Sequence, residues 1–204
     1  MIRAVLFDLD GVLTLDKTGN VTTCRYFFEK LGVDYQSLFE YRNQFDEAID
    51  RGKTNNTAVW KAIFKAHGMD LNPAWLKEAN ESTPIDEKMM GYVREFKKKC
   101  KVGIITDNEK GRVDDVSALN GWNGLFDSIT ISDVVGSTKA DEPIYGVAMG
   151  GLGVKPNECV LIDNTMRNVE MARRVGMRGI YFDDERRDYG EIERLFISTQ
   201  IKIL

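Results

Sequence analysis

The chain has 204 residues, 43% hydrophobic and 29% charged, which is ordinary for a soluble globular protein. Its formal net charge of -4 makes nucleic acid an unexpected partner, and no apolar run is long enough to cross a bilayer, so no membrane contact is expected. The three widely spaced cysteines form no CxxC pair, and no signal peptide is visible, so we expect a cytoplasmic protein.

The first predicted element ends in an acidic motif. Residues Ala4 to Phe7 form an apolar run typical of a strand, and Asp8, Asp10 and Gly11 follow it. Side chains two positions apart in a strand point to the same face, so the two carboxylates are expected to emerge together. They repel each other unless a cation or a proton lies between them, as in a metal site or a pair of nucleophile and acid. A strand that runs into an Asx turn would explain the same residues without any function.

A helical insert is predicted after this motif. About ninety residues separate the first two predicted strands, far more than one crossover needs. One apolar face at helical spacing is formed by Leu38, Tyr41, Phe45 and Ile49. Asn72-Pro73 and Thr83-Pro84 are each expected to begin a helix, because proline fits the first helical position. We expect a small helical bundle over residues 16–82.

Four further apolar runs predict the rest of a sheet. They are Val102–Ile105, Ile129–Ile131, Val160–Ile162 and Gly179–Phe182, and segments of helical length lie between the later ones. Alternating strands and helices imply a parallel sheet that is covered on both faces. The sequence therefore predicts an α/β protein with a doubly wound parallel sheet over residues 1–15 and 83–204.

Polar residues follow several of these strands. Thr106, Asp107 and Asn108 come after the second, Lys139 after the third, and Asp163 and Asn164 after the fourth. Ligands of doubly wound sheets bind outside the carboxyl ends of the strands, so we expect these residues to converge with Asp8 and Asp10. The set suits phosphoryl transfer, in which a carboxylate attacks phosphorus while a divalent cation and a lysine offset the negative charge.

Together these motifs resemble the haloacid dehalogenase-like (HAD) superfamily of hydrolases, most of which are phosphatases. The matches are Asp8-x-Asp10-Gly11-Val12-x-Thr14, Thr106-Asp107-Asn108, Lys139-x-Asp141-x-x-Ile144-Tyr145 and Val160-Leu161-Ile162-Asp163-Asn164-x-x-x-Asn168-Val169-x-x-Ala172. They span nearly the whole predicted core in the family's order. The resemblance implies a Rossmann-like core, with the predicted bundle as a helical cap domain inserted between the first two motifs.

The resemblance also implies a role for each motif residue. Asp8 would be the nucleophile and Asp10 the general acid and base, with Lys139 as a third catalytic residue. The substrate-binding residues would be Thr106, Asp107, Asn108 and Lys139. Magnesium would be held by residues drawn from Asp8, Asp10, Asn164 and Asp163.

Two positions depart from the family's pattern. Many relatives have a second aspartate where this chain has Asn164, so magnesium should bind more weakly unless Asp163 substitutes as the ligand. Which of the two contacts the metal stays open at this stage. In the third motif Ala140 stands where relatives have proline, and Pro143 lies further along the chain.

The resulting prediction is a Mg²⁺-dependent phosphatase that hydrolyses a small phosphorylated metabolite through an aspartyl-phosphate intermediate. A phosphomutase of the same superfamily and a non-catalytic phosphate-binding protein on the same scaffold are the alternatives. A dehalogenase is disfavoured, because such relatives lack the second acid that Asp10 supplies. Cap residues that could contact the substrate are Arg25, Arg42, Arg51, Lys53 and Asn56. The identity of the substrate and the choice between monomer and homodimer do not follow from the sequence.

Overall fold

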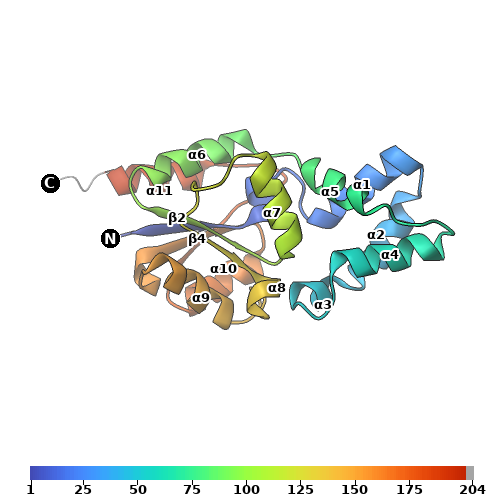
Figure 1. Ribbon diagram of the computed structural model, residues 1–204. Helices are drawn as coiled ribbons and strands as arrows, with labels where there is room; N and C mark the ends of the chain where they lie inside the picture. Colours follow the sequence, from blue (N-terminus) through green and yellow to red (C-terminus); the bar gives the residue numbers. More distant parts are fainter. Residues whose placement is uncertain (201–204) are drawn as a thin grey trace.

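The computed structural model describes residues 1–200 and contains one parallel sheet in the strand order β3-β2-β1-β4-β5 (Figure 1). Its strands are β1 (Ala4–Phe7), β2 (Lys101–Thr106), β3 (Ser128–Ile131), β4 (Cys159–Asp163) and β5 (Arg178–Tyr181). The predicted α/β class and doubly wound parallel sheet are confirmed, and each predicted strand is found to within a residue at either end.

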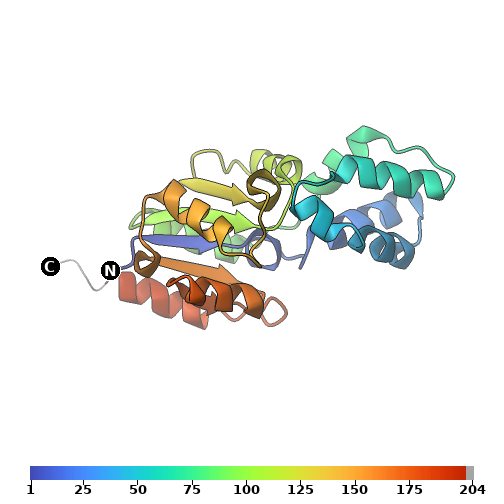
Figure 2. The ribbon, with the colours of Figure 1, turned by 90° about the horizontal axis from the view of Figure 1, so that it is seen from below.

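Helices cover both faces of the sheet. One face carries α6 (Glu87–Lys97), α7 (Lys110–Leu119) and α11 (Gly190–Gln200), and the other carries α9 (Pro143–Leu152) and α10 (Met166–Arg174) (Figures 1 and 2). The short elements are η1 (Leu9–Leu13), α8 (Ser132–Val135) and η2 (Pro156–Glu158). None of the helices within residues 1–200 is long and apolar enough to cross a membrane.

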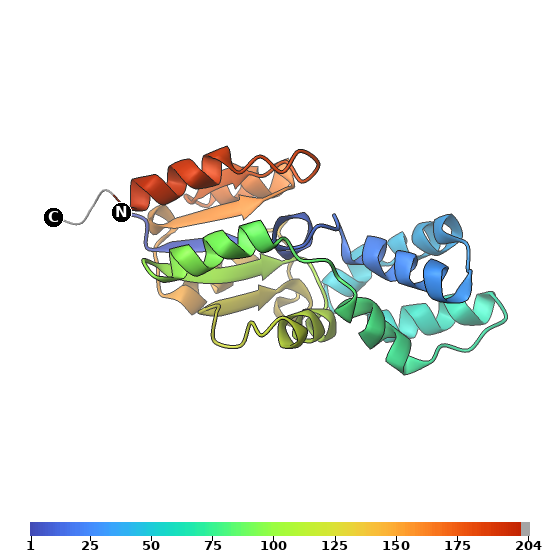
Figure 3. The same cartoon turned by 90° about the horizontal axis from the view of Figure 1, so that it is seen from above.

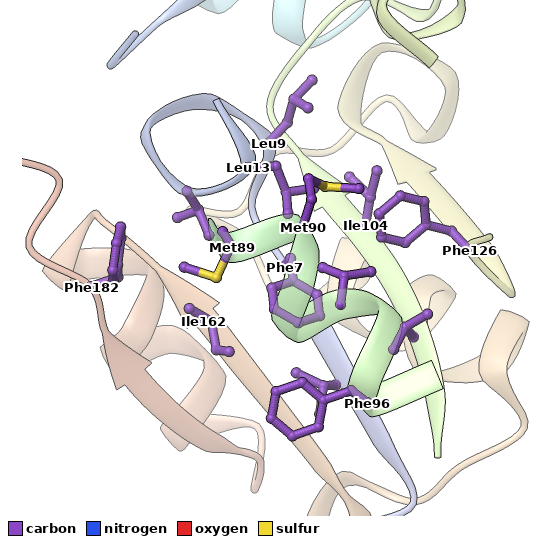
Figure 4. Close-up of a cluster of buried hydrophobic side chains, with 14 of the residues drawn as sticks. Phe7, Leu9, Leu13, Met89, Met90, Phe96, Ile104, Phe126, Ile162 and Phe182 are labelled. Carbon is purple, nitrogen blue, oxygen red and sulfur yellow. The ribbon is translucent and has the colours of Figure 1, made fainter. Parts of the chain in front are cut away.

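Strand β1 shows why both faces must be covered. Val5 and Phe7 pack on the side of α6, whereas Ala4 and Leu6 pack on the side of α9, as the alternation of side chains along a strand requires. All four are fully buried. Figure 4 shows Phe7 among side chains of the α6 side. Because β1 has no polar position, the first charged residue after the strand begins is Asp8, directly beyond its carboxyl end.

Five α-helices occupy the chain between β1 and α6. They are α1 (Gly19–Leu31), α2 (Tyr35–Asn43), α3 (Asp46–Asp50), α4 (Asn56–Ala66) and α5 (Pro73–Glu81), and they lie beyond the carboxyl ends of the strands (Figures 1 and 3). They share a core of their own, in which the Phe27 ring lies 4.9 Å from Trp60 and 4.8 Å from Phe64 between centroids. We call α1–α5 the cap helices; the domain boundaries at residues 16 and 82 stay a prediction.

Two local predictions within this region are wrong. Leu38 and Ile49 do not belong to one helix, because the chain leaves helical geometry at Phe45 and begins α3 at Asp46. Thr83-Pro84 does not begin α6, which begins at Glu87 with the Asp86 carboxylate accepting a hydrogen bond from the Met89 amide at 2.8 Å.

The two segments that join the cap helices to the core pair with each other, and this explains why Thr83-Pro84 does not begin a helix. Thr14 and Ile85 form an antiparallel bridge, and the Leu15 amide donates to the Pro84 carbonyl at 2.8 Å. This pairing requires extended backbone at Pro84, which the local proline signal does not reveal. The two connections therefore leave the core side by side.

Candidate active site

Asp8 stands where β1 ends, and its position is set by the register of the sheet. Its amide donates to the Ile162 carbonyl at 3.0 Å, which continues the pairing of Phe7 with Ile162 and brings Asp8 beside Asp163. The Oδ1 atom of Asp8 accepts a hydrogen bond from the Leu9 amide at 2.7 Å. One carboxylate oxygen is thereby fixed in place, and the residue is only 7% exposed.

The buried ammonium of Lys139 lies between two carboxylates. Its Nζ atom is 2.6 Å from Oδ2 of Asp8 and 2.8 Å from Oδ2 of Asp163. The backbone of Lys139 is held as well, because its amide donates to Asp107 at 2.8 Å and its carbonyl accepts from the Tyr145 hydroxyl at 2.8 Å. The sequence-predicted lysine is therefore positioned by both its backbone and its side chain.

The charges around Lys139 do not balance. Burial works against its charged form, but Asp163, Asp8 and Asp107 together raise the pKa of the ammonium above its usual value. Burial raises the pKa of Asp8 well above its usual range, and the charge of Asp163 adds to this while Lys139 opposes it. One ammonium thus faces three carboxylates, and the site favours a further positive charge or a proton.

Asp10 is held by residues of the second motif and of α7. The Asn108 amide donates to Oδ2 of Asp10 at 2.8 Å, and Asn108 also donates to the Thr106 hydroxyl at 3.3 Å. Arg112 donates to both oxygens of Asp10, at 2.7 and 3.0 Å. Asp10 is consequently a fixed carboxylate whose oxygens are both bound by donors from the other half of the chain.

Gly11 allows the chain to turn next to Asn164. Its φ of +75° suits glycine, and a Cβ atom there would lie 2.1 Å from Nδ2 of Asn164. That Nδ2 donates to Oδ2 of Asp184 at 3.2 Å. Because a carboxylate accepts and an amide nitrogen donates, this contact assigns the orientation of the Asn164 amide and leaves its Oδ1 free of Asp184.

These residues surround a cavity of about 200 Å³ between the sheet and the cap helices. The predicted site residues that line it are Asp8, Asp10, Thr106, Asp107, Asn108, Lys139 and Asn164. From the cap side it is lined by Gly19, Asn20, Thr23, Arg42, Asp46, Asp50 and Asn56, with Lys17 and Thr18 of the segment before α1. The sheet thus brings the four motifs to one place, as the sequence predicts.

Asp163 does not line the cavity. It is fully buried, and its oxygens accept hydrogen bonds from Lys139 at 2.8 Å, from the Thr165 amide at 2.8 Å and from Asn168 at 3.1 and 3.3 Å. Asp163 therefore anchors Lys139, and the cavity-facing member of the pair is Asn164.

The polar cap residues named from the sequence divide into two groups. Arg42 and Asn56 line the cavity, whereas Arg25 pairs with Asp16 at 2.6 Å and Arg51 pairs with Asp141 at 2.8 Å. Lys53 is exposed and does not line the cavity.

Three residues of the site were missed by sequence reasoning. Arg112 lies on α7, one helical turn beyond the Thr106-Asp107-Asn108 motif. This short distance from the motif was the one feature of the sequence that could have indicated its place in the site. Asp50 and Asp184 carry no signal in the sequence, because their importance comes from what lies opposite them in the fold.

Comparison with known proteins supports the family that the site residues resemble. Residues 2–176 match the family model of the haloacid dehalogenase-like hydrolases. The chain belongs to this family. The hydrolase is 25% identical over 233 residues to glyceraldehyde 3-phosphate phosphatase of Methanopyrus kandleri, an alignment that covers 100% of this chain and 96% of that protein. It is 26% identical over 192 residues to the chloroplastic protein Suppressor of Quenching 1 of Arabidopsis thaliana, covering 88% of this chain but only 18% of that protein.

Solved structures share the fold of the hydrolase. A HAD-like family hydrolase from Porphyromonas gingivalis superimposes with a TM-score of 0.75 at 21% identity, covering 96% of this chain and 98% of the other. The magnesium complex of a HAD family enzyme from Bacteroides thetaiotaomicron gives a TM-score of 0.75 at 18% identity. The superposition covers 95% of this chain and 98% of the other. At these identities the likeness establishes the fold and leaves the substrate open.

Proposed function

We propose that this hydrolase is a Mg²⁺-dependent phosphatase that cleaves a small phosphate monoester through an aspartyl-phosphate on Asp8. The observation that carries the proposal is the convergence of Asp8, Asp10 and Lys139 on one polar cavity. Relatives support it, since two that align over most of their length are named as phosphatases of glyceraldehyde 3-phosphate and phosphoglycolate.

The first half-reaction assigns a role to each of the three residues. A carboxylate oxygen of Asp8 attacks phosphorus, and the bond from phosphorus to the ester oxygen breaks. Asp10, in its protonated form, gives its proton to the departing oxygen, so the leaving group departs as a neutral alcohol. Lys139 lies 2.6 Å from the attacking carboxylate and offsets the negative charge that gathers there.

The second half-reaction reverses the role of Asp10. As a carboxylate it takes a proton from water while the water oxygen attacks the phosphorus of the aspartyl-phosphate. The bond between phosphorus and Asp8 breaks, which releases inorganic phosphate and restores the free carboxylate. The Thr106 hydroxyl accepts a hydrogen bond from Asn108, and its own hydrogen can be donated to a phosphate oxygen in both steps.

The donor set of the cavity fits magnesium. No three acidic, histidine or cysteine side chains within residues 1–200 form a cluster that could hold a metal by themselves, but Mg²⁺ uses few protein oxygens and keeps several waters. We propose that Asp8, the backbone carbonyl of Asp10 and the amide oxygen of Asn164 would hold it. When bound, the ion supplies positive charge at the phosphate oxygens. Asp163 has no such role in the proposal, because it is fully buried and does not line the cavity.

Asp10 also separates phosphatase from dehalogenase chemistry. L-2-haloacid dehalogenase of Xanthobacter autotrophicus shares the fold with a TM-score of 0.70 at 16% identity. A halide leaves without a proton, so such a reaction has no use for a second carboxylate held at the leaving-group side. The fixed position of Asp10 beside Asn108 favours an alkoxide leaving group that must be protonated.

The proposal is tested by phosphate release from p-nitrophenyl phosphate and a panel of phosphorylated metabolites, with and without Mg²⁺. We expect magnesium-dependent release by the wild type and none by Asp8→Asn, which should keep its fold by circular dichroism. Asp70→Asn, an exposed change on the cap side, is the matched control and should behave as wild type. An active, folded Asp8→Asn variant, or no release from any ester at any Mg²⁺ concentration, would contradict the proposal.

A further inference from the structure

The cavity is polar on every side. Apart from Gly19, each residue that lines it within the described chain carries a charged, amide or hydroxyl side chain. The aromatic core of the cap helices stays away from it, since Phe27, Trp60 and Phe64 pack against one another. A leaving group enclosed here would lie among side chains that nearly all carry a hydrogen-bonding group.

The cap side of the cavity is held rigid by a network around Arg42. Its Nε and Nη2 atoms donate to Oδ1 of Asn56 at 3.0 and 2.7 Å, and its guanidinium also pairs with Asp46. Asn20 donates to Asp46 at 2.8 Å and to Asn43 at 2.8 Å. Arg42 is only 5% exposed, so these polar groups are fixed before any ligand arrives.

Asp50 stands apart from this network. No group within residues 1–200 hydrogen-bonds to or forms an ion pair with its carboxylate, although Asp107, Asp46, Arg42 and Lys139 all influence it electrostatically. Its carboxylate therefore lines the cavity as an acceptor that a ligand could use.

The neighbours of Asp50 in the chain hold it in this position. Ile49 is buried in the core of the cap helices, and Arg51 pairs with Asp141 of the α/β core at 2.8 Å. At the next residue, Gly52 has a φ of +66° and approaches Asp133 so closely that a Cβ atom would lie 2.7 Å from its carbonyl oxygen. The carboxylate of Asp50 is therefore fixed over the core on the side of Lys139 and Asp107.

Resting on the proposed phosphatase function, we infer that the substrate is the phosphate monoester of a small polyhydroxylated alcohol, and that Asp50 accepts a hydrogen bond from a hydroxyl of its leaving group. Hydroxyls both donate and accept, which matches a wall of carboxylates, amides and a guanidinium. An alkyl or aryl leaving group would desolvate these groups without replacing their hydrogen bonds. The cavity volume of about 200 Å³ restricts the ligand to a small metabolite.

An ammonium-bearing leaving group fits the wall less well. The wall offers donors as well as acceptors, since the Arg42 guanidinium lies on the same side of the cavity as Asp50, and an ammonium cannot accept from them. A hydroxyl can donate to the ionised carboxylate of Asp50 and accept from its protonated form, whereas an ammonium can only donate. Aminoalcohol phosphates therefore serve as a comparison in the test.

The test compares esters of matched length on the full chain with Mg²⁺. Glycerol 1-phosphate, n-propyl phosphate and 3-aminopropyl phosphate differ only in the groups that the cap side would contact. We expect kcat/KM for the glycerol ester to exceed that for the propyl ester by at least about 100-fold, since sites built to bond hydroxyls reject analogues that lack them. Asp50→Ala should reduce this ratio by about tenfold or more, and Asp70→Asn should leave it unchanged.

Each outcome has a distinct meaning. Equal or faster hydrolysis of the propyl or aminopropyl ester would overturn the substrate class while leaving the phosphatase proposal intact. An unchanged ratio in folded Asp50→Ala would overturn the role of Asp50. Loss of hydrolysis of all three esters, with no activity on any other phosphate ester, would instead contradict the proposed function.

Discussion

Arg112 and Asp10 form a bidentate ion pair, although they lie 102 positions apart in the chain. Arg112 comes from α7 and is 4% exposed, and Asn108 bonds to the same carboxylate from the loop before that helix. The arrangement fixes the plane of the Asp10 carboxylate.

We therefore expect Arg112→Ala to lower kcat by about 100-fold with little change in KM, because a displaced acid fails in the chemical step and not in binding. Arg112→Lys should recover only part of the loss, since an ammonium lacks the planar fork of a guanidinium. Steady-state kinetics on the best substrate measure both effects, and the exposed Arg174→Ala on α10 is the control. A rise in KM alone would show that Arg112 binds substrate and does not position Asp10.

Magnesium affinity should follow the charge at the fourth motif. Asn164→Asp restores a carboxylate and is expected to lower the Mg²⁺ concentration for half-maximal activity by about tenfold, whereas Asp184→Ala should raise it because the amide loses the acceptor that orients it. The same order should appear in the Mg²⁺-induced rise of the melting temperature without substrate. A flat response of both variants would remove Asn164 from the proposed ligands.

Asp50 should make stability depend on pH. Burial, with Asp107 and Asp46 nearby, raises its pKa from 3.8 to about 7 in the folded chain. The unfolded chain therefore loses this proton at lower pH than the folded chain, and the free energy of unfolding falls as pH rises through this range. Asp50→Asn removes the cost of the buried anion and should be more stable than wild type by about 1–3 kcal/mol at pH 8.

Urea unfolding of wild type and Asp50→Asn at pH 5 and pH 8 measures this difference. We expect the gap between the two proteins to be larger at pH 8, where the wild-type carboxylate is ionised. A gap that does not change with pH would mean that Asp50 titrates at its ordinary pKa in the folded protein.

Arg187 should stabilise the turn that carries Asp10. Its guanidinium donates to the carbonyls of Gly11 at 3.3 Å and Val12 at 3.1 Å, and it pairs with the buried carboxylate of Asp86. Arg187→Ala leaves that carboxylate without its cation and is expected to lower the free energy of unfolding by about 3 kcal/mol. Its exposed neighbour provides the control, since Arg186→Ala removes only a surface contact with Asp183. Equal denaturation midpoints for the two variants would refute this role.

Much of the core could be predicted because its signals are local. Each strand is a short apolar run, and parallel strands place the residues that follow them at one edge of the sheet. Asp8, Thr106, Lys139 and Asn164 could therefore be expected to share a site before any coordinates were known, and they line one cavity.

The partners of these residues could not be predicted in the same way. Whether Asp163 or Asn164 faces the cavity depends on the direction in which each side chain leaves the end of β4, and on Lys139 and Asn168 already bonding to Asp163. The interruption of helical geometry at Phe45, which separates α2 from α3, likewise could not be predicted, because the apolar spacing continues across it.

The amino-acid sequence by itself determined the kind of sheet and the chemical groups at its carboxyl edge, because hydrophobic periodicity and strand termination act over a few residues. Only the tertiary structure decided that Arg112 binds Asp10, and that Asp50 faces the cavity with no hydrogen-bonding or ionic partner among residues 1–200. These relationships join segments far apart in the chain, and their distances are set by how helices pack on the sheet.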